Sequence, residues 1–420
     1  MPTPLDPSPR APAPRSVTTT RWSLMAQFAL FGVLGTSWMS RLPSIRADLG
    51  LSAGQLGSLL VVGGVGTLVA VLGTGAVVAR FGTRATLVAA TAGNVAGFGL
   101  LAVGTSTGDV VPFAAGAALN GVSGALVNIP ININAASVER AVGRAILPHF
   151  HACFSIGAAL GALVAAGFAA LGMTVATQLV AVMLVVTVLR AVLVVPSTAL
   201  APERAVGTDG AGAARGSGVR AALGAWREPR TLLIGLVLLA ASLSEGSAGT
   251  WMSLAVVDGF EAREAVGAVA YGTFVTSMTV VRFAGTGLID RYGRVAVLRA
   301  SGASALVGLL LFGLSPSIVT AWVGVVLWGC GAALANPIAI SAASDEPVHA
   351  APRVAVATSF STVAMLSAPP LLGLLADAVG VRHALLAICA AVVLSLAVSG
   401  RVRPLTEDGA TDDRTGAHAP

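Results

Sequence analysis

Residues 231–256 read TLLIGLVLLAASLSEGSAGTWMSLAV, an apolar run long enough to cross a bilayer as one helix. Its only charged side chain is Glu245. The whole chain of 420 residues has the same character, because 55% of its residues are hydrophobic and only 10% are charged. Soluble domains carry about 25% charged residues, so this composition excludes a soluble protein of such a size. It predicts a protein that crosses the membrane many times.

Twelve stretches of similar length and composition follow one another along the chain. They cover residues 22–42, 55–79, 85–105, 110–134, 148–170, 174–195, 231–256, 266–288, 295–314, 317–340, 354–375 and 383–400. We therefore predict an all-α integral membrane protein of 12 transmembrane helices in two six-helix halves, residues 21–195 and 231–403. Residues 196–230 form the predicted cytoplasmic linker. Residues 1–20 and 404–420, which are polar or rich in Pro, are predicted to be disordered cytoplasmic tails.

The arginines indicate the orientation. All 25 basic residues are Arg, and they are spread over short loops, which argues against a nucleic-acid partner despite the net charge of +6. With the N-terminus inside, 20 of the 25 fall in cytoplasmic segments, Arg190 among them. The opposite side holds Arg41, Arg46, Arg263 and Arg382, and Arg282 lies within a span. Loops rich in Lys and Arg remain on the cytoplasmic side of the membrane. We therefore predict a multi-pass protein of the cell (inner or plasma) membrane with both termini cytoplasmic.

Short sequences recur at about half the chain length. WMS at 38–40 recurs at 251–253, and RFG at 80–82 recurs as RYG at 291–293. The matches keep their order, so the two halves are parallel repeats of six spans each. Parallel repeats around a central site are typical of alternating-access transporters.

One loop carries a more specific signature. Residues 287–294, between the eighth and ninth predicted spans, read GLIDRYGR, and the loop after the second span has Ala79 in place of the acid. The positions retained in the two loops are Gly75, Arg80, Gly82, Arg84, Asp290, Arg291, Gly293 and Arg294. Both loops resemble the signature G-x-L-A-D-R-x-G-R of the major facilitator superfamily (MFS). The resemblance implies the MFS fold and a role of these loops in conformational switching, with a plain topological anchor as the alternative.

A narrower resemblance involves the fourth, fifth and seventh spans. Residues 128–144 and 151–157, together with Glu245 and Trp251, resemble the poorly characterised YbjJ-like branch of the superfamily. That branch tends to carry acids where this chain has Asn128 and Thr250. The loss of two acids implies a different substrate or coupling ion.

The resemblance implies a secondary active transporter of a small organic solute, driven by a proton gradient. The amides and tryptophans of the predicted spans fit a sugar-like or drug-like metabolite as cargo. We expect a monomer in the lipid bilayer with no cofactor or metal. No G-x-x-x-x-G-K-[ST] motif or catalytic cluster is present, which argues against ATP-driven transport and against an enzyme. A sensor or scaffold that keeps the MFS fold without transport is the alternative, and Ala79 favours it.

Glu245 is the one carboxylate deep in a predicted span. It lies roughly 21 Å along its helix, near the membrane midplane. Ionisable groups there are costly and are functional candidates by default. A carboxyl in such surroundings can bind and release a proton near neutral pH, which predicts proton coupling. A structural Glu bonded to neighbouring helices is an equal alternative. For Arg282 we expect snorkelling or pairing with Asp290 rather than substrate binding.

Polar and aromatic side chains complete the predicted cavity. Asn128 and Asn132 are four residues apart and share a helix face. Their amides need polar partners in lipid, which a cavity, a neutral substrate or interhelical hydrogen bonds would supply. The predicted cavity residues are Trp38, Asn120, Asn128, Asn132, His151, Glu245, Trp251, Trp328 and Asn336. The tryptophans would stack on a ring-shaped substrate or anchor the membrane interface.

Overall fold

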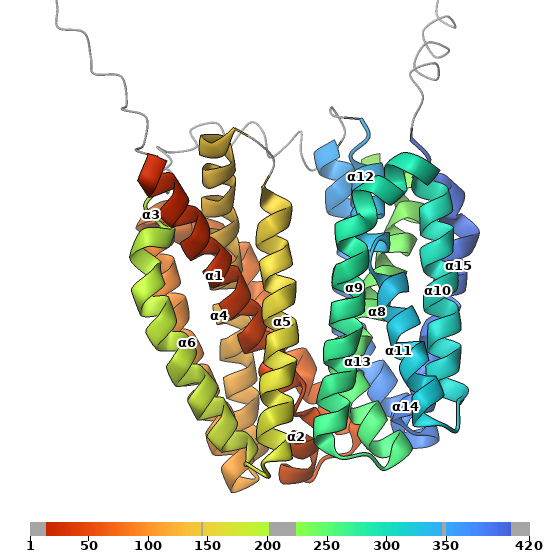
Figure 1. Cartoon of the computed structure of the whole chain (residues 1–420), viewed down its shortest axis with the longest axis horizontal. Helices are drawn as coiled ribbons and strands as arrows, with labels where there is room; N and C mark the ends of the chain where they lie inside the picture. Colours follow the sequence, from red (N-terminus) through yellow and green to blue (C-terminus); the bar gives the residue numbers. More distant parts are fainter. Residues whose placement is uncertain (1–13, 144–145, 201–223, 347–349, 405–420) are drawn as a thin grey trace, which may run out of the picture. The chain divides into compact units, whose positions relative to one another are not determined.

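The computed structural model describes residues 14–143, 146–200, 224–346 and 350–404 (Figure 1). All regular structure in these ranges is helical. The first helices are α1 (Pro14–Met39), α2 (Leu42–Asp48), α3 (Ala53–Thr107), α4 (Val110–Val142), α5 (Leu147–Ala170) and α6 (Val175–Ser197). The later helices are α8 (Pro229–Phe260), α9 (Glu264–Tyr292), α10 (Arg294–Leu314), α11 (Ile318–Ala332), α12 (Ala335–Ala343), α13 (Ala350–Val379), α14 (Val381–Ala384) and α15 (Ile388–Val398). Short 3-10 turns at Leu385–Ala387 and Ser399–Val402 flank α15.

Within the described residues, ten helices are long and apolar enough to cross a membrane. One of them, α3, has 55 residues and covers two of the predicted spans. The predicted first span lies in α1, which is not among the ten. Polar side chains dilute its apolar character, and Gln27, Thr36 and Ser37 are all buried within the structure. Each of the remaining predicted spans coincides with helix.

The chain separates into two compact units. The N-terminal unit comprises residues 1–50 and 62–207, and the C-terminal unit comprises 51–61 and 208–420. Residues 51–61, which the sequence analysis placed in the N-terminal half, thus belong to the C-terminal unit. Most of the predicted tails and linker lie outside the described residues, although α1 begins at Pro14, inside the predicted first tail.

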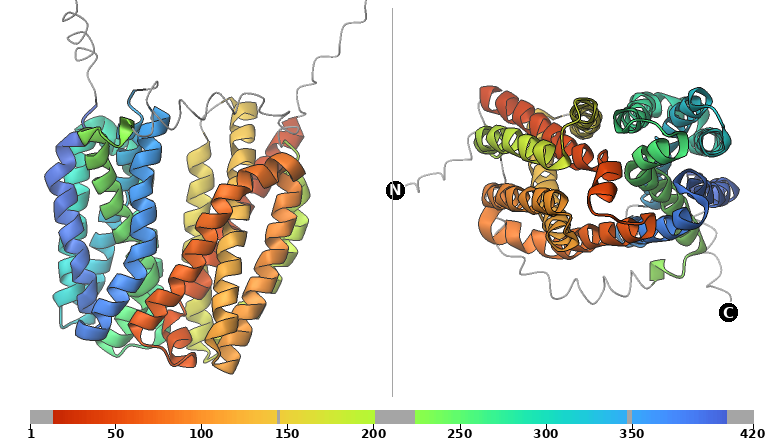
Figure 2. Two further views of the ribbon diagram at one scale, coloured as in Figure 1. Left: turned by 180° about the vertical axis from the view of Figure 1, so that it is seen from behind. Right: turned by 90° about the horizontal axis from the view of Figure 1, so that it is seen from below.

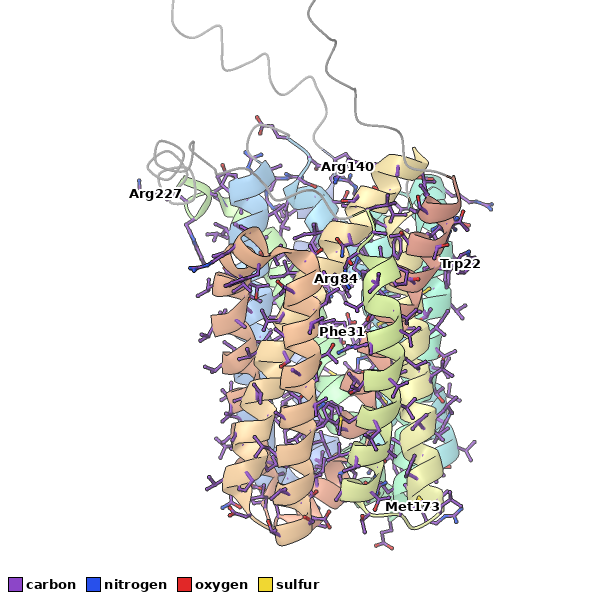
Figure 3. The ribbon with its side chains drawn as sticks, turned by 90° about the vertical axis from the view of Figure 1, so that its left-hand side faces the viewer. Trp22, Phe31, Arg84, Arg140, Met173 and Arg227 are labelled. Atoms are coloured by element: carbon purple, nitrogen blue, oxygen red, sulfur yellow. The ribbon has the colours of Figure 1, made fainter. Side chains whose placement is uncertain are left out.

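In the N-terminal unit, α1 packs against α5, α6 and α4 (Figure 1). Its apolar core includes Leu24 and Phe28 of α1, Ile131 of α4 and Phe150 of α5, all nearly inaccessible. Trp22, Arg84 and Arg140 lie toward one end of this unit and Met173 lies at the other (Figure 3).

In the C-terminal unit, α8 is the central helix and packs against α13, α9, α15 and α12. Its core centres on the large rings of Trp251, Phe274, Phe312 and Trp328, each no more than 1% exposed. The start of α3 lies beside α13 in this unit (Figure 2). A Cβ atom on Gly57 would fall 2.2 Å from the carbonyl oxygen of Pro369, so only glycine permits this approach.

Glycine also makes three sharp helix reversals. Gly82 lies inside α3 with φ 82° and ψ 165°, Gly293 separates α9 from α10 with φ 78° and ψ 157°, and Gly380 separates α13 from α14 with φ 84° and ψ 149°. This region of backbone space is essentially restricted to glycine. The similar backbone angles at Gly82 and Gly293 are consistent with the predicted repeat of the two loops.

Candidate functional site

An ion pair inside the C-terminal unit forms the centre of the candidate site. Nη2 of Arg282, from α9, lies 2.9 Å from Oε2 of Glu245, from α8. Nδ2 of Asn336, from α12, donates to the same oxygen at 3.2 Å. The side chains of Arg282 and Glu245 are 32% and 30% exposed, so the pair is partly open rather than sealed in a core. Its groups remain within reach of a solute or a proton.

A break between α11 and α12 positions Arg282. Nε of Arg282 donates to the backbone oxygen of Ala333 at 3.1 Å. That oxygen would normally accept from the backbone nitrogen four residues later, which here is Pro337, a residue without an N–H. The proline therefore frees the carbonyl that holds the arginine. Non-helical backbone at membrane depth is tolerated where it contacts protein or lines a cavity.

Of the two expectations for Arg282, snorkelling or pairing with Asp290, the pairing with Asp290 is wrong. Asp290 is exposed near the end of α9 and makes no ion pair among the described residues. Eight residues along one helix separate the two side chains by about 12 Å, too far for contact. Glu245, on the adjacent helix α8, lies within reach. Spacing in the sequence gives the distance between Arg282 and Asp290 along one helix. It does not show which residues of a neighbouring helix lie close to Arg282.

The asparagines of α4 separate into two groups. Nδ2 of Asn132 donates to Oδ1 of Asn128 at 2.9 Å and to its backbone oxygen at 2.8 Å. Asn128 is exposed and Asn132 is half-buried, so this pair presents amide groups on an open face of the N-terminal unit. Asn120 instead accepts from Asn94 of α3 at 2.9 Å. Asn120 is half-buried, and its amide is directed toward α3 rather than toward Asn132.

Arg190 lies with this interior group. The sequence analysis assigned it to a cytoplasmic segment, but it sits within α6 and is only 3% exposed. Its Nη1 donates to Oδ1 of Asn94 at 2.8 Å. Arginine at the end of an apolar run resembles a loop residue in sequence, and only the packing of α6 shows it to be internal.

Two of the predicted cavity tryptophans are core residues. Trp251 is 1% exposed and Trp328 is inaccessible, with Nε1 of Trp328 donating to Oγ of Ser244 at 2.8 Å. Neither ring is available to stack on a solute. Trp38 is half-buried in the N-terminal unit and meets Phe113 edge-on at 6.3 Å between ring centroids. His151 is exposed at the start of α5, with its ring edge-on to Phe28 at 5.6 Å.

The two loops with the signature sequence, around Gly82 and Gly293, show matching geometry in the two halves. The guanidinium of Arg80 lies over the ring of Phe81 at 5.3 Å, and that of Arg291 lies over Tyr292 at 5.2 Å. Gly75 lies in ordinary helix within α3, before the reversal at Gly82. Arg84, after the reversal, is exposed.

An acidic residue that sequence reasoning did not select joins the second loop to its unit. Asp345, which follows α12, forms ion pairs with Arg294 and with Arg230. Ala-Ala-Ser at 135–137 recurs at 342–344, directly before two acids, Asp345 and Glu346. This repeat is the signal in the sequence that could have pointed to Asp345.

A further acid, Asp377 at the end of α13, caps the start of α3 within the C-terminal unit. It accepts from Oγ of Ser52 at 2.9 Å and from the backbone nitrogens of Ala53 at 2.9 Å and Gly54 at 3.0 Å. Ser52 and Gln55 add a reciprocal capping box to the same helix end.

Long apolar helices in two units, with a partly open ion pair held by a broken helix, define a polytopic α-helical membrane protein. Residues 23–354 match the family model of the Major Facilitator Superfamily. The chain is 31% identical over 370 residues to an uncharacterized transporter, y4wD, of Sinorhizobium fredii, covering 86% of this chain and 93% of the relative. It is 27% identical over 357 residues to an uncharacterized MFS-type transporter of Yersinia pestis, covering 83% and 87%. The chain belongs to the Major Facilitator Superfamily.

Solved structures agree on the fold. The nucleoside transporter NupG superposes with a TM-score of 0.70 at 16% identity, covering 91% of this chain and 98% of that one. The fucose:proton symporter FucP of E. coli superposes with a TM-score of 0.58 at 14% identity, covering 93% and 100%. The chain thus has the MFS fold, and its family members are membrane transporters of small solutes rather than enzymes.

Proposed function

We propose that the chain is a proton-coupled secondary active transporter that moves a small organic solute by alternating access. The observation that carries the proposal is the partly open pair of Glu245 and Arg282. Ionisable residues inside a membrane domain mark substrate and proton pathways, and broken helices commonly build transporter sites. Here an ionisable residue lies beside a broken helix: Asn336, which follows the break between α11 and α12, donates to Glu245.

The pair provides a simple coupling scheme. Protonation of Glu245 removes the negative charge that holds Arg282, whose donors then become available to an oxygen acceptor on the solute. A bound solute in turn competes with Glu245 for Arg282 and favours the protonated carboxyl. Such effects between two ligands are reciprocal in free energy. The scheme requires that the solute and the proton bind together.

The donors suggest the type of cargo. Arg282 offers several N–H groups, and Asn336 offers an amide that both donates and accepts. Hydroxyl and carbonyl oxygens satisfy such groups, which supports a sugar-like solute or a polar, drug-like metabolite. The names of two fold neighbours, a nucleoside transporter and a fucose:proton symporter, are consistent with a polar, ring-shaped cargo.

Three further features belong to this proposal. We propose that both termini are cytoplasmic, which the location of Arg84 and Arg140 at one end of the N-terminal unit supports (Figure 3). We propose that the protein acts as a monomer. We also propose that it belongs to the YbjJ-like branch, on the residues around Asn128 and His151.

Flux in proteoliposomes tests the proposal. Sugars and toxic metabolites are supplied with and without an imposed pH gradient, and we expect the gradient to drive accumulation of one class. Glu245→Gln should abolish that dependence, whereas Glu261→Gln, on the exposed residue after α8, should not. Proton-driven flux that is unchanged in Glu245→Gln would contradict the coupling scheme. Solute binding without any flux would favour the alternative, a sensor that keeps the fold.

A further inference from the structure

The interior of the N-terminal unit contains a cation that has no anionic partner among the residues that the structure describes. Arg190 of α6 is 3% exposed, and among the described residues no carboxylate pairs with it. Among the described residues, its one hydrogen bond is from Nη1 to the neutral amide oxygen of Asn94 at 2.8 Å. Arginine stays protonated in proteins, so the charge persists in this buried position.

The unused edge of the guanidinium is the one suited to an anion. Nε and Nη2 of Arg190 are both buried and have no hydrogen-bond partner among the described residues. These two nitrogens direct their N–H bonds side by side, in the fork that arginine uses to bind carboxylate and phosphate. Two adjacent donors of one guanidinium thus lack an acceptor among the described residues.

The surrounding polar groups add donors rather than acceptors. Asn94 uses both ends of its amide, because its Nδ2 donates to Oδ1 of Asn120 at 2.9 Å. Nδ2 of Asn120 and Oγ of Ser123, one turn along α4, are buried without a partner in the described structure. Ser123 lies against α3 beside Asn94, where a Cβ on Gly93 would approach Oγ to 2.3 Å. The cluster has an excess of hydrogen-bond donors around a fixed positive charge.

Such a cluster is unfavourable unless a negative charge compensates it. An isolated buried ion loses several kcal/mol of hydration, and a neutral water molecule restores hydrogen bonds but not charge balance. Because Arg190 is covered, the headgroup of a surrounding lipid does not reach it. We propose that the N-terminal unit binds a small inorganic anion of the chloride class on the Nε and Nη2 edge of Arg190, between α3, α4 and α6.

Thermal unfolding of the full-length protein in detergent tests the site, with chloride exchanged for gluconate at constant ionic strength. A ligand that binds only the folded state stabilises it as its concentration exceeds Kd. We expect Tm to rise by about 5 °C, with saturation, as chloride replaces gluconate at a hundredfold excess over Kd. Equal Tm in both salts overturns the proposal.

Two variants separate the anion from general destabilisation. Asn94→Asp places a carboxylate beside Arg190, and we expect it to remove the chloride dependence while keeping the protein folded. Arg41→Met is the matched control, because Arg41 is also a buried arginine of this unit but bonds Gln178 and the oxygen of Met173. It should lower Tm and keep the dependence on chloride. Persistence of the dependence in Asn94→Asp overturns the site.

Bromide gives a direct readout that does not depend on variant stability. Crystals grown with bromide in place of chloride should show anomalous scattering beside Nε and Nη2 of Arg190. Bromide found only elsewhere, or no bound halide at saturating concentration, overturns the assignment.

Discussion

Glu245 and Arg282 compensate each other inside the C-terminal unit, with 2.9 Å between Oε2 and Nη2. Neither residue has another charged partner in the described structure that could replace the other. The pair is therefore both a structural element and the candidate for the transport chemistry.

Removal of one member of the pair should destabilise the protein more than removal of both. We expect Glu245→Gln and Arg282→Gln each to lower the free energy of unfolding by about 2 kcal/mol, less than for a fully buried pair because both side chains retain some solvent. The double variant should lose less than the sum of the two. Equilibrium unfolding in mixed micelles measures the cycle, and additive losses would show that the two charges do not interact.

The helix break should control how tightly Arg282 is held. Pro337→Ala restores an N–H that can bond the oxygen of Ala333, in competition with Nε of Arg282. We expect KM for the transported solute to change several-fold while Tm stays equal or rises. Pro196→Ala, in α6 of the other unit, is the control and should leave KM unchanged. An unchanged KM in Pro337→Ala would show that the break between α11 and α12 has no effect on substrate binding.

The reversals at Gly82 and Gly293 should be intolerant of any side chain. A Cβ at either position meets no atom within 4 Å, so the cost is purely conformational. At these backbone angles we expect alanine to cost about 1–3 kcal/mol. Gly75→Ala should cost nothing, since Gly75 is in open, ordinary helix. Thermal unfolding compares the three variants, and an equal effect at Gly75 would contradict the conformational argument.

Trp328 should behave as a core residue and not as a substrate platform. Trp328→Phe removes the hydrogen bond to Ser244 and part of an inaccessible ring. We expect a loss of about 1–2 kcal/mol in stability. KM of the transported solute should not change. A higher KM at unchanged stability would restore the predicted stacking role.

The ten candidate spans within the described residues could be predicted because each is a long apolar run, a signal contained within one segment of the chain. Pairings between segments have no such signal. For Arg282, snorkelling or pairing with Asp290 on its own helix was expected, whereas its partner Glu245 comes from a neighbouring helix. Trp328 was identified by its residue type, but burial decided its role. The place of Glu245 inside a long helix could be predicted, because a lone carboxylate in an apolar run is visible in the sequence.

Arg190 and Asp377 are two further residues whose partners could not be predicted from the sequence. Both looked like residues at the end of a span, and their importance depends on helices far away in the sequence. Asp377 bonds the start of α3, more than 300 residues earlier. Such long-range partners follow from packing, which composition and spacing do not encode.

The cap that Asp377 places on α3 should contribute measurably to the stability of the C-terminal unit. Asp377→Ala leaves the nitrogens of Ala53 and Gly54 without their acceptor, and loss of an N-terminal cap costs about 0.5–2 kcal/mol. Asp109→Ala is the matched control, because Asp109 caps α4 through a single bond to the nitrogen of Val111. We expect the larger loss at Asp377, and Asp377→Asn should recover part of it because an amide oxygen still accepts. Unfolding in mixed micelles measures the three variants, and a loss at Asp377 no larger than that at Asp109 would mean that the contact between α13 and α3 adds nothing to the fold.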